Sequence, residues 1–346
     1  MMDTRLHRVK WGAGQPRKRT SAKYWREPLK WNARADTFVE CGQCGWRGDL
    51  AADRTDILSA HCPTCQGTQW KPARRRVFCA SLGDVFDNEV PQAWRDDLFE
   101  LIAKTPNLTW MLLTKRIGNV GNMLPVPFDF DKHFPHVWLG ATVCYQKEAA
   151  LDIRKLLGIP AAKHFLSIEP MLGAIDLVAA GGLWIDAAIS DPIKRIINQR
   201  EAAACYDGES MIDLVIAGGE SGVDARPSHP NWFRRLRDQC EAAGVPFFFK
   251  QWGEWASGAT DLRTGEMAFR EYQRYEDWLA KPQWINGGIC LDAAGRELKR
   301  GSDFKRANEA GQFPVTVMHR VGKEAAGCRL DGRQHLCLPD DDHVQH

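Results

Sequence analysis

Six short apolar runs in the middle of the chain constrain its fold more than any other feature of the sequence. Each run is continuously apolar rather than alternating, which is typical of parallel strands that are buried on both faces. Amphipathic stretches with helical spacing separate the runs, so the pattern is a repeated βα unit. We therefore predict parallel strands at residues 76–82, 109–115, 136–143, 163–170, 213–220 and 246–253.

The stretches between these runs carry the end signals of helices. Residues 90–106 have Pro91 near the predicted helix start and place their apolar side chains on one face. Residues 146–160 and 229–246 each finish with a Gly-x-Pro stop. Repeated strand–helix units of this kind predict an α/β fold with a partial or closed (β/α) barrel.

Polar residues follow the predicted strands at their carboxyl ends, where α/β barrels carry their functional groups. Each of them, taken alone, could cap a helix or pair with a neighbouring charge. As a set they would converge on one rim, and we therefore treat the rim as the candidate site. Its polar and glycine residues are Ser81, Asp84, Thr114, Lys115, Arg116, Thr142, Ser167, Glu169, Gly218, Gly219, Glu220, Ser221, Lys250 and Gln251.

The rim segment AGGESG at residues 217–222 has two adjacent glycines at a strand end. Glycine permits close approach of a ligand to the backbone, and Glu220 could then accept a hydrogen bond from an amine or a ribose hydroxyl. The segment is not the G-x-G-x-x-G dinucleotide fingerprint. The single cysteines and the histidines share no ligand or triad spacing, so we assign no catalytic residue.

Two C-x2-C pairs form the most specific local motif, CGQC at residues 41–44 and CPTC at residues 62–65. A C-x2-C turn lets both thiolates bind one ion, and two turns give a closed tetrahedral site. We predict a zinc ribbon with Cys41, Cys44, Cys62 and Cys65 as ligands and a structural role; a single iron is the alternative. Gly45 is expected to adopt the positive φ that often follows the second ligand.

Cysteine usage and charge bear on compartment and partners. The chain has eleven cysteines but neither an apolar leader nor a run of about 18 apolar residues, so we expect a cytoplasmic protein with reduced thiols and no membrane span. Ten Lys and Arg side chains lie among the first 35 residues, against two acidic ones. Trp11, Trp25 and Trp31 are interleaved with them. This basic arm is either a solvated edge or a contact surface for nucleic acid.

Seven sequence blocks occur in order along the chain: FCASLGDVFDNEVP, LLTKRIGNV, VWLGATV, FLSIEPMLG, LVIAGGESG, ARPSHPNWFRRLRDQC and GVPFFFKQWGEW. Together they resemble the phage-associated three-Cys-motif family, a radical-SAM-like domain of unknown function. The resemblance covers roughly residues 5–256. Residues 257–346 match it less distinctly and contain a hairpin-like segment at 289–301.

The resemblance implies a radical-SAM type of barrel that cleaves S-adenosylmethionine reductively at a four-iron four-sulfur cluster. With the basic arm in view, we expect such a protein to act on or near nucleic acid. By matching strand ends, it implies that Lys115, Arg116 and Lys250 face an anionic substrate. It also implies that the cofactor pocket is lined by Ser81, Thr142, Glu169, Gly218, Gly219 and Glu220.

The family's cysteine motif comes shortly before a block that begins here at Arg5. We therefore expect that motif to be encoded upstream of Met1 and this chain to lack the cluster. The competing hypothesis is a non-catalytic zinc-ribbon protein that binds nucleic acid or a partner protein from the same phage or defence locus. The expected domains are a basic arm (1–35), the zinc ribbon (36–72), the barrel-like domain (73–256) and a small C-terminal region (257–346).

Overall fold

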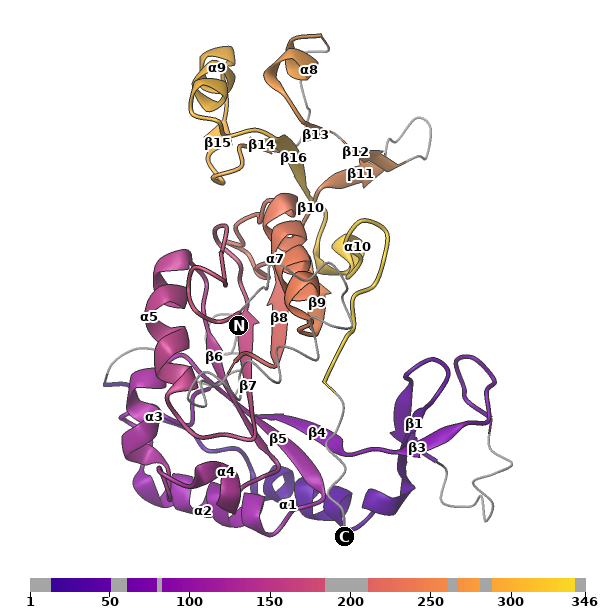
Figure 1. Cartoon of the computed structure of the whole chain (residues 1–346), viewed down its shortest axis with the longest axis vertical. Helices are drawn as coiled ribbons and strands as arrows, with labels where there is room; N and C mark the ends of the chain where they lie inside the picture. The colour runs from indigo at the N-terminus through magenta and orange to yellow at the C-terminus, as the bar shows by residue number, and fades with distance from the viewer. Residues whose placement is uncertain are drawn as a thin grey trace. The chain divides into compact units, whose positions relative to one another are not determined.

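The computed structural model describes residues 14–50, 61–79, 83–183, 211–260, 267–269, 271–280 and 288–339. Its main feature is a six-stranded parallel sheet, curled into a half-barrel, with the strand order β4-β5-β6-β7-β8-β9 (Figure 1). The strands are β4 (Arg75–Cys79), β5 (Leu108–Thr114), β6 (Val137–Thr142), β7 (Lys163–Ile168), β8 (Leu214–Gly218) and β9 (Phe247–Gln251).

This sheet confirms the predicted strands and the partial form of the predicted barrel. Strands that are neighbours in the sheet are also neighbours in the chain, as expected when a helix returns the chain between successive parallel strands. β5 and β8 are buried along their whole length, which explains their continuously apolar sequences. Among the described strands, pairing runs from β4 to β9 without closing the circle.

The chain divides into two compact units, one made of residues 1–140, 159–163 and 340–346 and the other of residues 141–158 and 164–339. The first unit contains β4, β5 and the start of β6. In its described part it also contains a short antiparallel sheet of order β2-β1-β3. Its other elements are α1 (Ala22–Asn32), η1 (Ala35–Thr37), β1 (Phe38–Cys41), β2 (Arg47–Asp49), β3 (Trp70–Pro72), α2 (Gln92–Ala103), α3 (Ile117–Met123) and α4 (Phe130–His133).

The second unit contains the end of β6 and the strands β7, β8 and β9. A further sheet of order β10-β16-β14-β15, with β13 paired to β16, follows in the chain, and its β14–β15 pair confirms the hairpin expected at residues 289–301. None of the described helices is long and apolar enough to cross a membrane. The remaining elements are α5 (Gln146–Leu157), α7 (Pro230–Ala243), β10 (Trp255–Ala256), β11 (Gly258–Thr260), β12 (Met267–Phe269), β13 (Glu271–Tyr272), α8 (Tyr275–Ala280), β14 (Gly288–Leu291), β15 (Glu297–Leu298), α9 (Gly301–Glu309), β16 (Val315–Arg320) and α10 (Lys323–Ala326).

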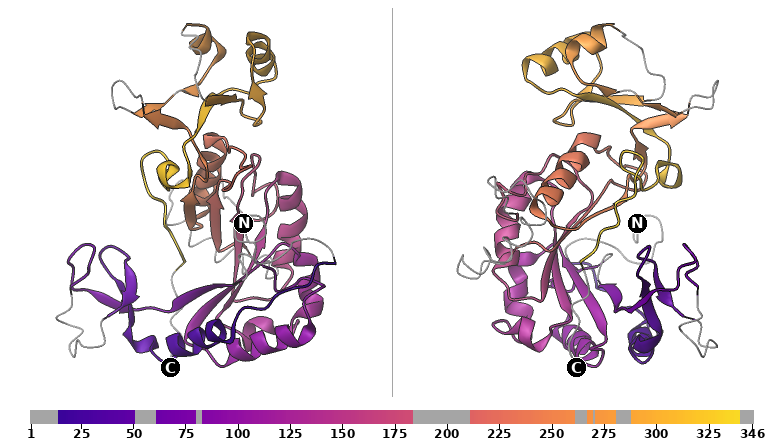
Figure 2. Two further views of the ribbon diagram at one scale, coloured as in Figure 1. Left: turned by 180° about the vertical axis from the view of Figure 1, so that it is seen from behind. Right: turned by 45° about the vertical axis from the view of Figure 1, so that its right-hand side comes forward.

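Residues 327–336 return to the edge strand β9 within the second unit, as two views of the ribbon show (Figure 2). The N–H of Phe249 donates to the carbonyl of His335 at 2.8 Å, and the N–H of Trp252 donates to the carbonyl of Gly327 at 3.0 Å. Phe248 and Leu336 form an antiparallel bridge. The returning segment therefore covers backbone groups that an exposed sheet edge would leave open to pairing with another chain.

Helix α7 begins and ends at the residues that the sequence signals predicted. Pro230 occupies its first turn, and Gly244 ends it in the left-handed conformation with φ +66°, as the helix-stop pattern requires. Nδ1 of His229 accepts a hydrogen bond from the N–H of Asn231 at 3.2 Å, and its Nε2 lies 3.2 Å from the carbonyl of Pro314. His229 is fully buried. Both bonds are satisfied only by a neutral imidazole with its proton on Nε2.

Acidification is expected to destabilise the second unit through His229. Burial lowers the pKa of His229 to about 4 from 6.5, and Arg234 adds to this while Asp292 opposes it. Because the folded-state pKa is the lower one, the unfolded chain binds the proton first. The stabilisation is thus complete above pH 6.5 and is lost as the pH falls toward 4. The loss amounts to about 3 kcal/mol at most.

Urea unfolding at several pH values measures this effect, with His229→Asn as the matched control. Asparagine keeps an oxygen to cap α7 but does not titrate in this range. The variant should show a smaller fall in the free energy of unfolding between pH 6.5 and 4 than the wild type. Equal pH dependence in both proteins would show that His229 does not control it.

Candidate functional site

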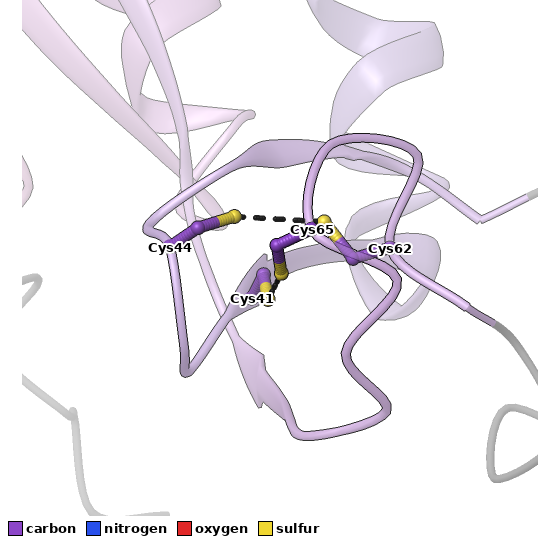
Figure 3. Close-up of side chains that lie close together, drawn as sticks. All are labelled: Cys41, Cys44, Cys62 and Cys65. Carbon is purple, nitrogen blue, oxygen red and sulfur yellow. Dashed lines mark hydrogen bonds between the residues drawn. The ribbon is translucent and has the colours of Figure 1, made fainter.

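The four ribbon cysteines form a compact group of sulfur atoms (Figure 3). Their Sγ atoms all lie within 4.8 Å of one another. Cys41 and Cys65 are 3.6 Å apart at Sγ, and so are Cys44 and Cys62. A tetrahedron with Zn–S bonds of about 2.3 Å has edges of about 3.8 Å. The sulfurs are therefore already placed for one tetrahedral ion.

The two C-x2-C turns have the same backbone structure. The N–H of Cys41 donates to Trp46 and that of Cys62 donates to Gly67, both at 2.8 Å. Gly45 and Gln66 follow the second cysteine of each turn and have φ +73° and +61°. The expected positive φ of Gly45 is confirmed, and the equivalent conformation at Gln66 is made by a residue with a side chain.

The turns also tune the thiols. Burial opposes ionisation of Cys62, but the N–H groups of Cys65 and Thr64 donate to its sulfur and lower the pKa of this thiol to about 7. Although the N–H of Trp46 favours the Cys44 thiolate, desolvation and the neighbouring sulfurs raise the pKa of Cys44 to about 12. Four adjacent thiolates repel one another, and a divalent cation removes that repulsion.

The donor set fits one ion and does not fit an iron–sulfur cube. A four-iron four-sulfur cluster places a metal–sulfur cage between its thiolates, so it needs sulfurs farther apart than these. Four thiolates also complete a tetrahedral shell and leave no position for substrate. In the described ranges, no other group of three or more His, Cys, Asp or Glu side chains has metal-binding geometry.

Arg75 ties the ribbon to the rest of the first unit. Its guanidinium pairs with Asp49 of β2 and lies over the ring of Phe38 of β1 at 4.5 Å. It also lies 5.5 Å from the ring of Trp31 on α1. Because Arg75 itself begins β4, its side chain connects α1 and the ribbon to the parallel sheet.

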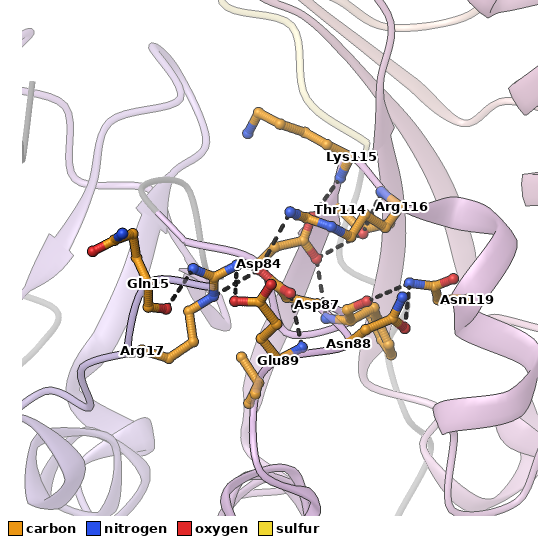
Figure 4. Close-up of polar contacts among 12 residues, drawn as sticks. Gln15, Arg17, Asp84, Asp87, Asn88, Glu89, Thr114, Lys115, Arg116 and Asn119 are labelled. Carbon is orange, nitrogen blue, oxygen red and sulfur yellow. Dashed lines mark hydrogen bonds and ion pairs between the residues drawn. The ribbon is translucent and has the colours of Figure 1, made fainter. Parts of the chain in front are cut away.

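The carboxyl ends of β4 and β5 meet in a network around Asp84 (Figure 4). The side chain of Asp84 is 4% exposed. It accepts hydrogen bonds from Thr114 Oγ1 and Lys115 N at 2.8 Å, and from Phe86 N at 3.0 Å. Arg116 pairs with Asp84 from outside at 3.2 Å. The carboxylate thus fixes the turn that follows β5.

Asp87 extends this network to the basic arm. Arg17 pairs with Asp87 at 2.8 Å and with Glu89 at 3.1 Å, and Arg116 reaches Asp87 at 3.2 Å. Burial alone would raise the pKa of Asp87, but the N–H of Glu89 and the charges of Arg116 and Arg17 lower it below its usual value. Arg116 therefore has two carboxylate partners, whereas the exposed Lys115 side chain points away from the network (Figure 4).

A second set of rim residues lies in the second unit, at the ends of β7, β8 and β9. Lys250 pairs with both oxygens of Glu169, at 3.1 and 3.2 Å, and Ser167 Oγ donates to the same carboxylate at 3.2 Å. Glu169 is 14% exposed. A Cβ on Gly218 would lie 3.0 Å from Glu169 Oε1, so this glycine makes room for the carboxylate.

Gly219 and Glu220 have partners within the chain. A Cβ on Gly219 would lie 1.9 Å from the carbonyl oxygen of Trp252, so the close approach that glycine permits here is to the chain's own backbone. Arg226 donates to both oxygens of Glu220 at 2.8 and 2.9 Å. These hydrogen bonds lower the pKa of the Glu220 carboxyl.

Thr142, at the end of β6, differs from the other rim residues. Its Oγ1 is buried and has no hydrogen-bond partner among the described residues. A buried hydroxyl without a partner costs about 1–3 kcal/mol. Ser81, the remaining expected site residue, lies outside the described residues. The structure thus brings together two sets, Asp84 with Lys115 and Arg116, and Glu169 with Gly218 and Lys250, each within one unit.

The comparison with protein families bears on the whole chain. The family DUF5131, described as "Protein of unknown function", matches residues 2–339. The chain belongs to this family. The expectation of a family of unknown function is thus confirmed, and the match includes the ribbon cysteines as well as the half-barrel. No curated protein and no solved structure matches the chain.

Sequence reasoning missed the partners that make these DUF5131 clusters. Asp87, Asn119 and Arg226 lie within the sequence blocks or beside them, but nothing in their spacing marks them. Asn119 donates to the carbonyl of Phe86 at 2.9 Å, joining the block after β4 to the block after β5. The order of the blocks could have predicted such contacts, because consecutive parallel strands place the loops that follow them side by side.

Proposed function

We propose that this DUF5131 protein binds one zinc ion through Cys41, Cys44, Cys62 and Cys65, and that the ion is structural. The observation that carries the proposal is the placement of four sulfurs within 4.8 Å on two matching turns. In this proposal the ribbon and the basic arm form a module that associates with nucleic acid. The alternative partner is a protein encoded in the same locus.

Elemental analysis of protein purified without added metal tests the metal assignment. We expect one zinc per chain, because a closed four-thiolate site of this size selects zinc in a reducing cytosol. One iron per chain, with the visible absorption of an iron–thiolate centre, would show that the site binds a single iron instead of zinc. Absence of any bound metal would contradict the proposal.

A second proposal concerns the half-barrel. We propose a radical-SAM-like protein in which the rim of the second unit, with Thr142, Glu169 and the segment Gly218–Glu220, binds S-adenosylmethionine. The buried Thr142 hydroxyl supports this proposal because a bound ligand would give it a partner. The described residues provide no fitting set of ligands for a four-iron four-sulfur cluster, so we derive no radical step and limit the proposal to binding.

Thr142→Val is expected to separate stability from ligand binding. Valine has the shape of threonine without the hydroxyl, so removing an unpartnered buried group should raise the free energy of unfolding by up to about 1 kcal/mol. If S-adenosylmethionine supplies the missing partner, calorimetry should show weaker binding to the variant than to the wild type.

Thr114→Val is the matched control, because its hydroxyl is hydrogen-bonded to Asp84. It should lose stability where Thr142→Val gains it, and it should leave binding at the second unit unchanged. No detectable binding of S-adenosylmethionine to the wild-type chain would remove the support for this second proposal without affecting the zinc site.

A further inference from the structure

One side of α1 carries exposed basic side chains, two of which have no ion pair among the described residues. Lys23, Arg26 and Lys30 are exposed, and their spacing of three and four residues places them on one side of the helix. Pro28 is the buried residue of α1. Among these three cations, Lys30 has a carboxylate partner, Glu27 at 3.0 Å.

The inward-facing cations of the same arm are treated differently. Arg17 pairs with Asp87 and Glu89, and Arg19 pairs with Asp97 at 2.6 Å. By contrast, the described residues contain no ion pair to four exposed cations along the arm and α1. These are Lys18, Lys23, Arg26 and Arg34. The arm thus uses alternate cations to attach to its own unit and presents the rest to solvent.

The aromatic side chains of this segment also divide into those covered by other side chains and one that is exposed. Arg19 covers one face of the Trp25 ring at 3.8 Å, and Arg75 lies over Trp31 at 5.5 Å. Tyr24 directly follows the exposed Lys23 on α1 and is 68% exposed. An exposed aromatic ring together with exposed, unpaired cations on the same segment suits a single strand, because bases can stack on the ring while phosphates contact the cations.

We infer that α1 and the residues on either side of it form a docking surface for single-stranded nucleic acid, with Lys18, Lys23, Tyr24, Arg26 and Arg34 as its contacts. The inference rests on the proposed association with nucleic acid and names the surface that makes it. It assigns base stacking to Tyr24 rather than to Trp25 or Trp31. Arg17 and Arg19 hold the arm in place and do not contact the strand.

The test uses the full chain and a fluorescein-labelled oligothymidylate of about 16 nucleotides, the upper range of one single-strand site. Affinity is measured by anisotropy between about 50 and 200 mM salt. Lys23→Glu with Arg26→Glu should reduce the slope of log affinity against log salt by about 1.4, since each lost phosphate contact contributes about 0.7. Tyr24→Ala should weaken binding about five-fold or more, and Tyr24→Phe should restore it.

The matched control is Lys147→Glu with Lys323→Glu, which makes the same charge change at exposed lysines elsewhere. It should leave the slope close to that of the wild type. Circular dichroism and zinc content must be unchanged in every variant, so that a loss of binding is not a loss of folding.

The outcomes distinguish the inference from the proposal beneath it. If the wild-type chain binds no nucleic acid at low salt, the proposed association itself fails. If it binds but the α1 variants behave like the control, the association stands and this surface is wrong. Equal affinity for duplex of the same sequence, with no effect of Tyr24→Ala, would overturn the assignment to single strands. Equal affinity for polyglutamate would favour an acidic protein instead.

Discussion

Cys62→Ser is expected to release the metal ion and unfold the ribbon. Cys62 is fully buried. The backbone N–H groups of its turn lower the pKa of its thiol to about 7, so this thiol ionises most readily to bind a metal ion. Binding of zinc supplies about 10–16 kcal/mol in isolated zinc fingers. The ribbon has few buried apolar side chains to replace that energy, since Val39 is its buried aliphatic residue among those described.

Hydrogen exchange and metal analysis together measure this result. The amides of β1, β2 and β3 should lose protection in the variant, while those of β7, β8 and β9 should keep theirs. Cys79→Ala is the control, because burial raises the pKa of this thiol to about 12 and it lies on β4 outside the sulfur group. Zinc retained at the wild-type level by a variant with all four ribbon cysteines changed to serine would show that the metal binds elsewhere.

Asp84→Ala should destabilise the first unit by about 2–4 kcal/mol, because two hydrogen-bond donors lose an almost fully buried charged acceptor. The change leaves the N–H of Lys115 and the hydroxyl of Thr114 without their acceptor. It also leaves Arg116 with Asp87 as its remaining carboxylate partner. The turn after β5 should loosen, and the melting temperature should fall by several degrees.

Arg116→Ala is the matched control for this prediction. Its side chain is 41% exposed, so its removal should cost about 1 kcal/mol or less, as is usual for an exposed ion pair. Asp84 would still accept bonds from Phe86, Thr114 and Lys115. If Asp84→Ala and Arg116→Ala have equal effects on urea unfolding, Asp84 is not the centre of the network.

The sequence alone determined the strands and helices of the half-barrel and the four-cysteine group. β5 and β8 are buried on both faces, and an unbroken apolar run is the direct record of that environment. α7 begins at a proline and ends at a glycine because those residues suit the two helix ends. The grouping of each cysteine pair was predictable for a similar reason, because a C-x2-C turn is local and places its two sulfurs without help from the rest of the fold.

Only the tertiary structure decided which rim groups have partners. The distance in sequence from Asp84 to Arg116, or from Glu169 to Lys250, says nothing about an ion pair, because the pair exists only when their strand ends become neighbours. The adjacent glycines Gly218 and Gly219 suggested that a ligand approaches the backbone here. In the structure, Gly219 packs instead against the backbone of Trp252. Likewise, a count of basic residues cannot separate Arg17, which Asp87 neutralises, from Lys23, which faces solvent. Local patterns record local geometry and average burial, whereas the pairing of charges depends on contacts between distant segments that only the folded sheet brings together.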